Sequence, residues 1–173
     1  MGVVQNATGE RLDRTSDLLN FNSTYSWLAW MNCTDTSGYP EGMSIANTAG
    51  TSWDSWWLSP GNTSISLGGV VGSSSAATIA SAIGWHHYAM IRESQTSLKL
   101  YYDGGLVKTI ASDVGTSRTA NYMHYGGWIT DGTLYWRGVL GPSKAWSRAL
   151  TIDEVKREMW TILPQSLLSI YEY

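Results

Sequence analysis

Apolar and polar residues alternate in short runs along most of the chain, as expected for half-buried β-strands. The segments 26–31, 85–91 and 98–102 combine aromatic with aliphatic residues and are bounded by polar or glycine residues. A polar loop separates the last two segments, which predicts an antiparallel hairpin. Asp103-Gly104-Gly105 follows and predicts a tight turn, because Asp and Gly tolerate positive φ. A third strand is expected over 106–110.

Two further features extend this β pattern. The segments 122–128 and 133–140 flank Thr130-Asp131-Gly132, which predicts a second hairpin. The small residues Gly68-Gly69 and Ser73–Ser75 predict loop tips between strands.

One short helix is predicted near the C-terminus. Thr151 and Glu154 have the spacing of a capping box, in which each side chain bonds the other residue's backbone N–H. The apolar positions after the cap recur at helical spacing: Ile152, Val155, Met159 and Ile162. Pro164 ends the pattern. Many short strands and a single helix predict an all-β, two-sheet antiparallel sandwich.

Strand alternation also assigns faces. In the segment 85–91, His87, Ala89 and Ile91 share one face, and His86, Tyr88 and Met90 share the other. The two adjacent histidines therefore point apart and cannot hold one metal ion together. Ala89 is expected to be buried beneath the second sheet.

Composition and charge narrow the choice of function. The chain has 10 Trp, 10 Tyr and one Phe. Its net charge is −3, so it lacks the excess of positive charge that is typical of nucleic-acid-binding domains. No Lys or Arg occurs between Arg14 and Arg92, and Asp54 is the only charge between Glu41 and Arg92. This segment forms buried strands, lies against another molecule, or consists of neutral polar loops. The sequence predicts no transmembrane helix and no membrane partner. Its N-terminus lacks the pattern of a secretory signal, so the chain either does not use that route or has had its signal removed.

Two segments resemble a known family. The run 85–91, followed by Leu100-Tyr101-Tyr102-Asp103-Gly104, resembles the W-x-H-h-A-h…L-Y-h-D-G hairpin of laminin G-like domains, where h is an apolar residue. These domains are concanavalin A-like jelly rolls. The segment 138–151 resembles the closing strand of that family, with Arg148-Ala149-Leu150 and then Glu154 at matching positions. The resemblance covers residues 9–163. It implies a jelly-roll domain over residues 1–163, followed by an apolar tail at 164–173.

The jelly-roll family includes glycoside hydrolases and calcium-binding domains. Such hydrolases place carboxylates at alternate positions of one strand, so that the acids face one cleft. This chain has no such run, so we expect no catalytic activity. Many laminin G-like domains hold a calcium ion at the rim, and Asp35, Asp54 and Asp131 are isolated loop candidates here. Calcium remains an option without assigned ligands, and no other cofactor is expected.

Glycan binding is the stronger chemical hypothesis. Sugars stack their C–H faces on flat aromatic rings, and the run Trp53-Asp54-Ser55-Trp56-Trp57 is the densest aromatic cluster. If this run is a strand, Trp53 and Trp57 share a face. The alternative is that these tryptophans fill the core. The candidate ligand residues are Trp53, Asp54 and Trp57, with Tyr39 and Trp128 on the same rim.

The tail suggests a second kind of role. Residues 160–164 resemble an ending found after laminin G-like domains in tailed-phage proteins, and the candidate docking residues are Leu167, Leu168, Ile170 and Tyr171. The first hypothesis is a non-catalytic virion protein, a capsid decoration or tail component. Its partners would be the major capsid or tail protein, copies of itself, and glycans. The alternative is an extracellular carbohydrate-binding module of a secreted or cell-surface protein.

Overall fold

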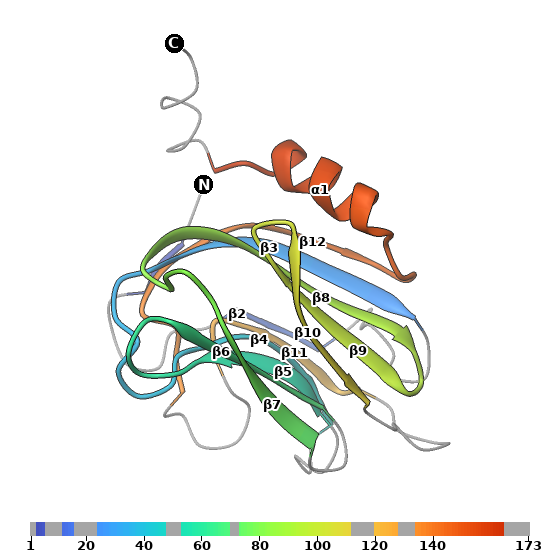
Figure 1. Cartoon of the computed structure of the whole chain (residues 1–173), viewed down its shortest axis with the longest axis horizontal. Coiled ribbons are helices and arrows are strands. Elements are labelled where there is room, and N and C mark those ends of the chain that lie inside the picture. The colour runs from blue at the N-terminus through green and yellow to red at the C-terminus, as the bar shows by residue number, and fades with distance from the viewer. Residues whose placement is uncertain are drawn as a thin grey trace.

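The computed structural model describes residues 3–5, 12–15, 24–47, 53–69, 73–111, 120–127 and 134–164. These residues form two antiparallel sheets of six strands each, stacked face to face, with one helix on the outer face of the first sheet (Figure 1). The predicted all-β jelly-roll sandwich with a short C-terminal helix is confirmed.

Each sheet mixes strands from distant parts of the sequence. The first sheet has the order β1 (Val3–Gln5), β12 (Gly138–Trp146), β3 (Tyr25–Cys33), β8 (Gly84–Ser94), β9 (Ser97–Tyr102) and β10 (Gly105–Ala111). The second sheet has the order β2 (Leu12–Arg14), β11 (Tyr122–Tyr125), β4 (Glu41–Ala46), β5 (Trp53–Leu58), β6 (Ser64–Gly69) and β7 (Ser73–Thr78). Strand β5 therefore lies inside the second sheet, between β4 and β6.

The hairpin and turn predicted around residue 103 are confirmed. Strands β8 and β9 pair in antiparallel register, with Tyr88 opposite Tyr102. Asp103 and Gly104 have φ of 46° and 75°, the positive values that a tight turn requires. Strand β10 then continues the sheet, as predicted.

Two predictions about local structure are wrong. Strands β11 and β12 lie in different sheets and so do not form a hairpin. One backbone hydrogen bond of 2.9 Å, from Trp136 to Gly126, joins the connecting segments. Gly68-Gly69 and Ser73–Ser75 belong to strands β6 and β7, which pair with each other, and are not loop tips. Glycine suits position 68 because the Trp53 and Trp57 rings of β5 lie against it.

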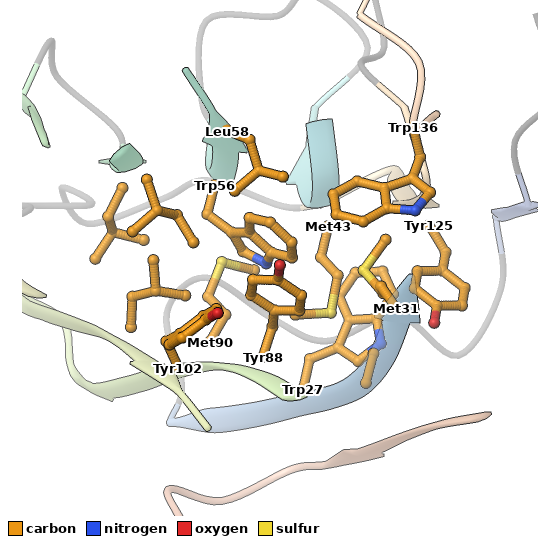
Figure 2. Packing of buried hydrophobic residues seen from close by; sticks show 14 of the residues in the cluster. Trp27, Met31, Met43, Trp56, Leu58, Tyr88, Met90, Tyr102, Tyr125 and Trp136 are labelled. Carbon is orange, nitrogen blue, oxygen red and sulfur yellow. The ribbon is translucent and has the colours of Figure 1, made fainter. Parts of the chain in front are cut away.

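Aromatic and sulfur-containing side chains fill the space between the sheets. Trp56 stacks on Tyr88 with ring centroids 4.2 Å apart, and Trp136 meets Trp56 edge-on at 5.7 Å (Figure 2). Both are favoured aromatic geometries. These residues come from both sheets and from the segment before β12, so the core joins distant parts of the chain.

A buried ion pair also connects the two sheets. Asp54 on β5 accepts hydrogen bonds from the Arg92 guanidinium on β8 and, at 2.6 Å, from the Tyr25 hydroxyl on β3. All three residues are fully buried. Burial beside the Asp54 carboxylate raises the pKa of Tyr25 well above its usual value. The charge-poor segment is therefore made largely of buried strands, and the charges at its centre are internal.

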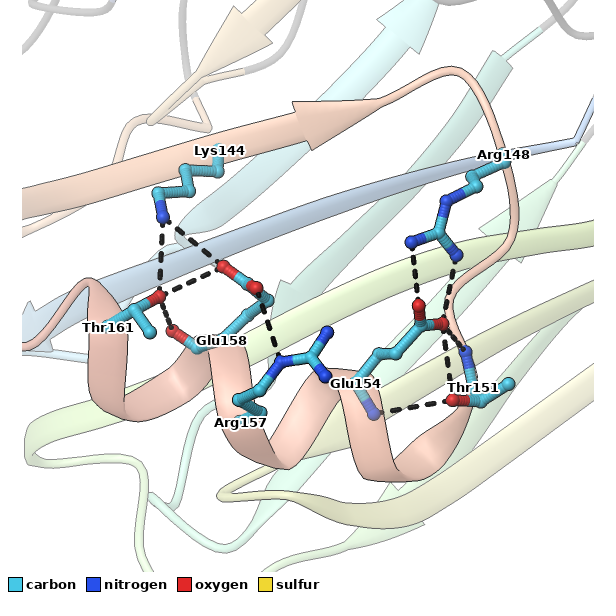
Figure 3. Close-up of polar contacts among 7 residues, drawn as sticks. All are labelled: Lys144, Arg148, Thr151, Glu154, Arg157, Glu158 and Thr161. Carbon is cyan, nitrogen blue, oxygen red and sulfur yellow. Dashed lines mark hydrogen bonds and ion pairs between the residues drawn. The ribbon is translucent and has the colours of Figure 1, made fainter.

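Helix α1 (Ile152–Thr161) covers the outer face of the first sheet. The Thr151–Glu154 capping box is present, and Arg148 donates two hydrogen bonds, of 2.9 and 2.6 Å, to the Glu154 carboxylate (Figure 3). Val155 is the buried residue of the helix and belongs to a second apolar cluster between the helix and the first sheet. Ala89 belongs to that cluster, so it is buried by the helix and not by the second sheet, contrary to prediction.

Candidate functional site

The two sheets differ in what lies on their outer faces. Helix α1 and its apolar cluster occupy the outer face of the first sheet (Figure 1). No helix from the described part of the chain covers the outer face of the second sheet. Side chains that point outward from β4, β5 and β6 therefore form a surface on which a ligand could rest.

Strand β5 places two tryptophans on that surface. Its side chains alternate, so Trp56 packs in the core while Trp53 and Trp57 face outward and are half-buried. The prediction that Trp53 and Trp57 share one face of the strand is confirmed. Their ring centroids are 6.3 Å apart, and the ring planes are inclined by 58°.

A glycine on the neighbouring strand sets the position of both indoles. Gly68 on β6 pairs with Ser55 on β5, midway between the two tryptophans. A Cβ atom at residue 68 would lie 2.4 Å from the Trp53 ring and 2.9 Å from the Trp57 ring. The indoles therefore lie across the bare glycine backbone, which explains why a strand interior tolerates glycine here.

A pocket of about 260 Å³ opens beside the indoles. Among the described residues, its lining includes Tyr39, Glu41, Trp53, Ser55, Trp57 and Leu134. The cavity is slightly smaller than the roughly 300–1,000 Å³ of pockets for drug-sized ligands. Its size therefore suits a small ligand, or one terminal unit of a longer ligand.

The loop before β4 holds Tyr39 at the pocket. Gly38 and Tyr39 both have positive φ, 75° and 55°, and Tyr39 is 49% exposed. The preceding turn is fixed by Asp35, which accepts hydrogen bonds from the Ser37 backbone at 2.8 Å and from Arg137 at 2.6 Å. The Ser37 hydroxyl also donates to Asp35, at 2.7 Å, and this bond, together with those from the Ser37 backbone and Arg137, lowers the pKa of Asp35 to about 2. The loop is thus braced from the segment before β12.

Two polar side chains lie at the base of the pocket. Ser55 is 1% exposed, and its hydroxyl has no hydrogen-bond partner among the described residues. Glu41 on β4 is buried and pairs in register with Trp57. The backbone N–H of Glu41 donates to the Leu134 carbonyl at 3.3 Å, which brings Leu134 to the same rim. The pocket therefore combines aromatic walls with oxygen atoms at its base.

The structure brings together three of the five candidate ligand residues from the sequence. Trp53, Trp57 and Tyr39 line one pocket. The prediction for Asp54 is wrong, because strand alternation turns its carboxylate into the core toward Arg92. Trp128 lies outside the described residues.

Sequence reasoning missed three pocket residues. Ser55 could have been found, because it stands two positions from both Trp53 and Trp57 and so shares their face. Glu41 is placed by the pairing of β4 with β5, and Leu134 by a backbone hydrogen bond to Glu41, and the local pattern specifies neither contact.

The described residues offer no metal-binding cluster. No group of three His, Cys, Asp or Glu side chains converges within the described ranges. Asp35 and Asp54 are held by arginines, and Asp131 lies outside those ranges. The two histidines diverge as predicted: His86 bonds Asp103 at 2.8 Å, whereas burial lowers the pKa of His87 to about 4. Calcium binding stays a prediction that the structure does not test.

The sequence also predicts docking residues in the tail and no transmembrane helix. The docking candidates Leu167, Leu168, Ile170 and Tyr171 all lie outside the described residues. Across the described ranges, no helix combines the length and apolar character needed to span a membrane.

Solved structures with the same fold include sugar-binding and laminin domains. A carbohydrate-binding module, CBM40, of the Ruminococcus gnavus IT-sialidase, bound to α2,3-sialyllactose, matches with a TM-score of 0.70 and 14% identity. That match covers 91% of this chain and 95% of the module. Domains LG4-5 of mouse laminin α1 match with a TM-score of 0.62 and 11% identity, over 87% of this chain and 43% of that one.

A larger enzyme contains a similar domain. Trypanosoma rangeli sialidase in complex with sialic acid matches with a TM-score of 0.74 and 13% identity, over 92% of this chain but 27% of the enzyme. These low identities establish a shared fold. No curated protein sequence matches the chain.

A family model matches most of the chain. The model describes the concanavalin A-like lectin/glucanases superfamily and matches residues 6–156. This agrees with the resemblance to laminin G-like domains found in the sequence. The chain belongs to the concanavalin A-like lectin/glucanase superfamily.

Proposed function

We propose that this chain is a carbohydrate-binding domain that holds a sugar in the pocket on the outer face of the second sheet. The observation that carries the proposal is the pair Trp53 and Trp57. Both face outward from the interior of a sheet, half-buried, and both line a pocket. In a sandwich whose core already contains Trp56 and Trp136, these two indoles are not needed to fill the interior.

The lining of the pocket has the chemistry that a sugar ring requires. A pyranose presents apolar C–H groups on one face and hydroxyls around its edge. Trp53 and Trp57 supply flat surfaces for the C–H face, and Tyr39 adds a third aromatic ring at the rim. Ser55 and Glu41 supply oxygen atoms for hydroxyls at the base. Such a combination of aromatic walls and few polar groups is typical of small-molecule sites.

The comparisons support this proposal over the virion role. The R. gnavus module is a carbohydrate-binding module and was solved with sialyllactose, and it matches this chain over almost its full length. An extracellular carbohydrate-binding module accordingly becomes the favoured interpretation. The role in a virion, with capsid or tail subunits as partners, rests on sequence features alone: the low charge, the single cysteine, the apolar tail and the resemblance of residues 160–164.

We further propose that binding is the domain's whole function. Glycosidases place two carboxyl groups across the cleft, roughly 5–9 Å apart. The described lining of this pocket includes one carboxylate, that of Glu41. The match to the T. rangeli sialidase covers only 27% of that enzyme, so the likeness is to one part of it.

The test compares two tryptophan variants on a glycan array. Trp57→Ala removes one wall of the pocket, whereas Trp160→Ala removes a tryptophan that is 55% exposed on helix α1. We expect wild type and Trp160→Ala to bind the same glycans. Trp57→Ala should lose about 30-fold in affinity, as for a typical aromatic hot spot. A folded Trp57→Ala variant with unchanged binding, or a wild type that binds no glycan, would overturn the proposal.

A further inference from the structure

Tyr39 lies at the pocket rim in a backbone conformation that tyrosine rarely adopts. Its φ is 55°, in the left-handed region, where bulky residues are uncommon. The other non-glycine residues with positive φ in the described part of the chain are Asn62 and Asp103, whose residue types tolerate it best. Pro40 follows Tyr39 and favours an extended backbone at the residue before it. The surrounding loop must therefore hold Tyr39 in place.

One arginine contacts this loop through both its backbone and its side chain. The Arg137 carbonyl accepts hydrogen bonds from the backbone N–H and the hydroxyl of Thr34, at 2.8 and 3.2 Å. Its Nη1 atom donates to Asp35 Oδ2 at 2.6 Å and to Ser37 Oγ at 2.7 Å. Its Nη2 atom lies 3.0 Å from the position that a Cβ atom would occupy at Gly38. The guanidinium therefore packs against the residue directly before the pocket tyrosine.

The backbone on both sides of Arg137 is itself anchored in the sandwich. Trp136 is buried in the core, and its indole N–H donates to the Asn32 carbonyl at 2.9 Å. Gly138 begins β12 and pairs with Cys33, the last residue of β3. The arginine thus reaches the loop from a well-packed position, and the contacts of its side chain transmit that position to the loop.

These contacts bear on how tightly a sugar is held. Ordering a loop and its side chains opposes association, so a rim residue that is already in place contributes more to binding. Strained residues persist at ligand sites where their surroundings fix them. Resting on the function proposed above, we infer that Arg137 is a positioning residue for the sugar: it holds the Tyr39 ring at the rim without lining the pocket itself. The arginine acts through the turn formed by Asp35 and Ser37.

The ion pair in this loop matters little for overall stability. The side chains of Arg137 and Asp35 are 42% and 47% exposed, and exposed ion pairs contribute little to the free energy of unfolding. Variants of this pair should therefore melt within about 4 °C of wild type. Tyr39→Asn tests the strain: asparagine adopts positive φ readily, so this variant should melt no lower than wild type although it binds glycan more weakly.

The experiment is a double-mutant cycle on the full chain. A glycan that binds on the array is titrated by calorimetry into wild type, Tyr39→Ala, Arg137→Met and the double variant. Each single variant should lose about 5-fold in affinity, and the double variant should bind no more weakly than Tyr39→Ala, because Arg137 acts through Tyr39. Arg137→Lys should recover part of the loss, since one nitrogen makes both side-chain bonds and an ammonium can replace it. Asp35→Asn removes the same ion pair from the other side and serves if Arg137→Met does not fold.

Arg148→Met is the matched control. Arg148 also donates two hydrogen bonds to a carboxylate, that of Glu154, but it lies beside helix α1 on the outer face of the other sheet (Figure 3). Its loss should leave glycan affinity unchanged.

The outcomes separate this inference from the function on which it rests. Wild-type affinity in Arg137→Met, or losses in Arg137→Met and Tyr39→Ala that add in the double variant, would overturn the inference. If Trp57→Ala still abolishes binding in that case, the proposed function stays intact. Binding of no glycan, or binding that is independent of Trp57, would overturn the proposed function itself.

Discussion

The substitution Gly68→Ala tests the geometry of the pocket without touching either tryptophan. The new methyl group would lie 2.4 and 2.5 Å from two atoms of the Trp53 ring and 2.9 Å from the Trp57 ring. Carbon atoms pack best at about 3.5–4.0 Å, so the Trp53 ring must move by about 1 Å or more. The wall that a sugar would contact is thereby displaced.

The expected effect on folding is small compared with the effect on binding. Overpacking costs about 1–3 kcal/mol, and we expect the lower end because both indoles border open space. Removing a strand glycine recovers about 0.5–1 kcal/mol. The free energy of unfolding should therefore fall by no more than about 2 kcal/mol, whereas affinity for the glycan should fall about tenfold or more, because the aromatic contact is a hot spot.

Gly105→Ala is the matched control for this variant. Gly105 also lies in a strand, at the start of β10, and a Cβ atom there would meet only the Tyr102 carbonyl at 3.5 Å, an ordinary contact. Binding is measured by calorimetry, and stability by urea unfolding followed through tryptophan fluorescence. If Gly68→Ala binds as tightly as Gly105→Ala, the indoles do not depend on Gly68 and the described geometry of the pocket is refuted.

Three other predictions concern single groups. Asp54→Ala leaves the Arg92 guanidinium buried without its carboxylate and should cost about 3–5 kcal/mol in urea unfolding, whereas Asp54→Ala/Arg92→Met should cost less. Ser55→Ala should leave the melting temperature unchanged or higher, because its hydroxyl has no partner among the described residues, while glycan affinity falls about 3- to 10-fold. Burial lowers the pKa of His87 to about 4, so the unfolded chain binds the proton first. Stability should therefore fall by up to about 3 kcal/mol as the pH drops from about 6.5 to 4, and His87→Leu should flatten that slope.

Each of these predictions has a result that contradicts it. An Asp54→Ala variant within about 1 kcal/mol of wild type would mean that Arg92 finds water or another partner. A Ser55→Ala variant that melts lower but binds normally would assign the hydroxyl a purely structural role. An unchanged pH slope in His87→Leu would show that other groups control acid unfolding.

Local alternation was enough to predict the fold class and one wall of the site. The period of two in the run 53–57 places Trp53 and Trp57 on one face, and the same rule orients the strand 85–91. Which face meets the core depends on the partner sheet. For this reason Ala89 was expected beneath the second sheet, although it is buried by helix α1.

Strand pairing over long distances accounts for what the sequence did not reveal. Gly68 reads as a loop residue until β6 is placed beside β5, where it becomes the surface on which two indoles rest. Asp54 reads as a surface acid until Arg92, 38 residues later, is placed opposite it. Glu41 enters the pocket through the pairing of β4 with β5, and Leu134 through a backbone hydrogen bond to Glu41; no short motif records either contact.

Contact between a sugar and the side chains of Trp53 and Trp57 can be observed through the indole N–H resonances of the tryptophans. The signals are assigned by single Trp→Phe variants, and the chain is titrated with a glycan that binds on the array. We expect the resonances of Trp53 and Trp57 to shift along a saturable curve, while those of Trp160 and the buried Trp56 stay in place. Saturable shifts at other tryptophans, with Trp53 and Trp57 unmoved, would contradict the account.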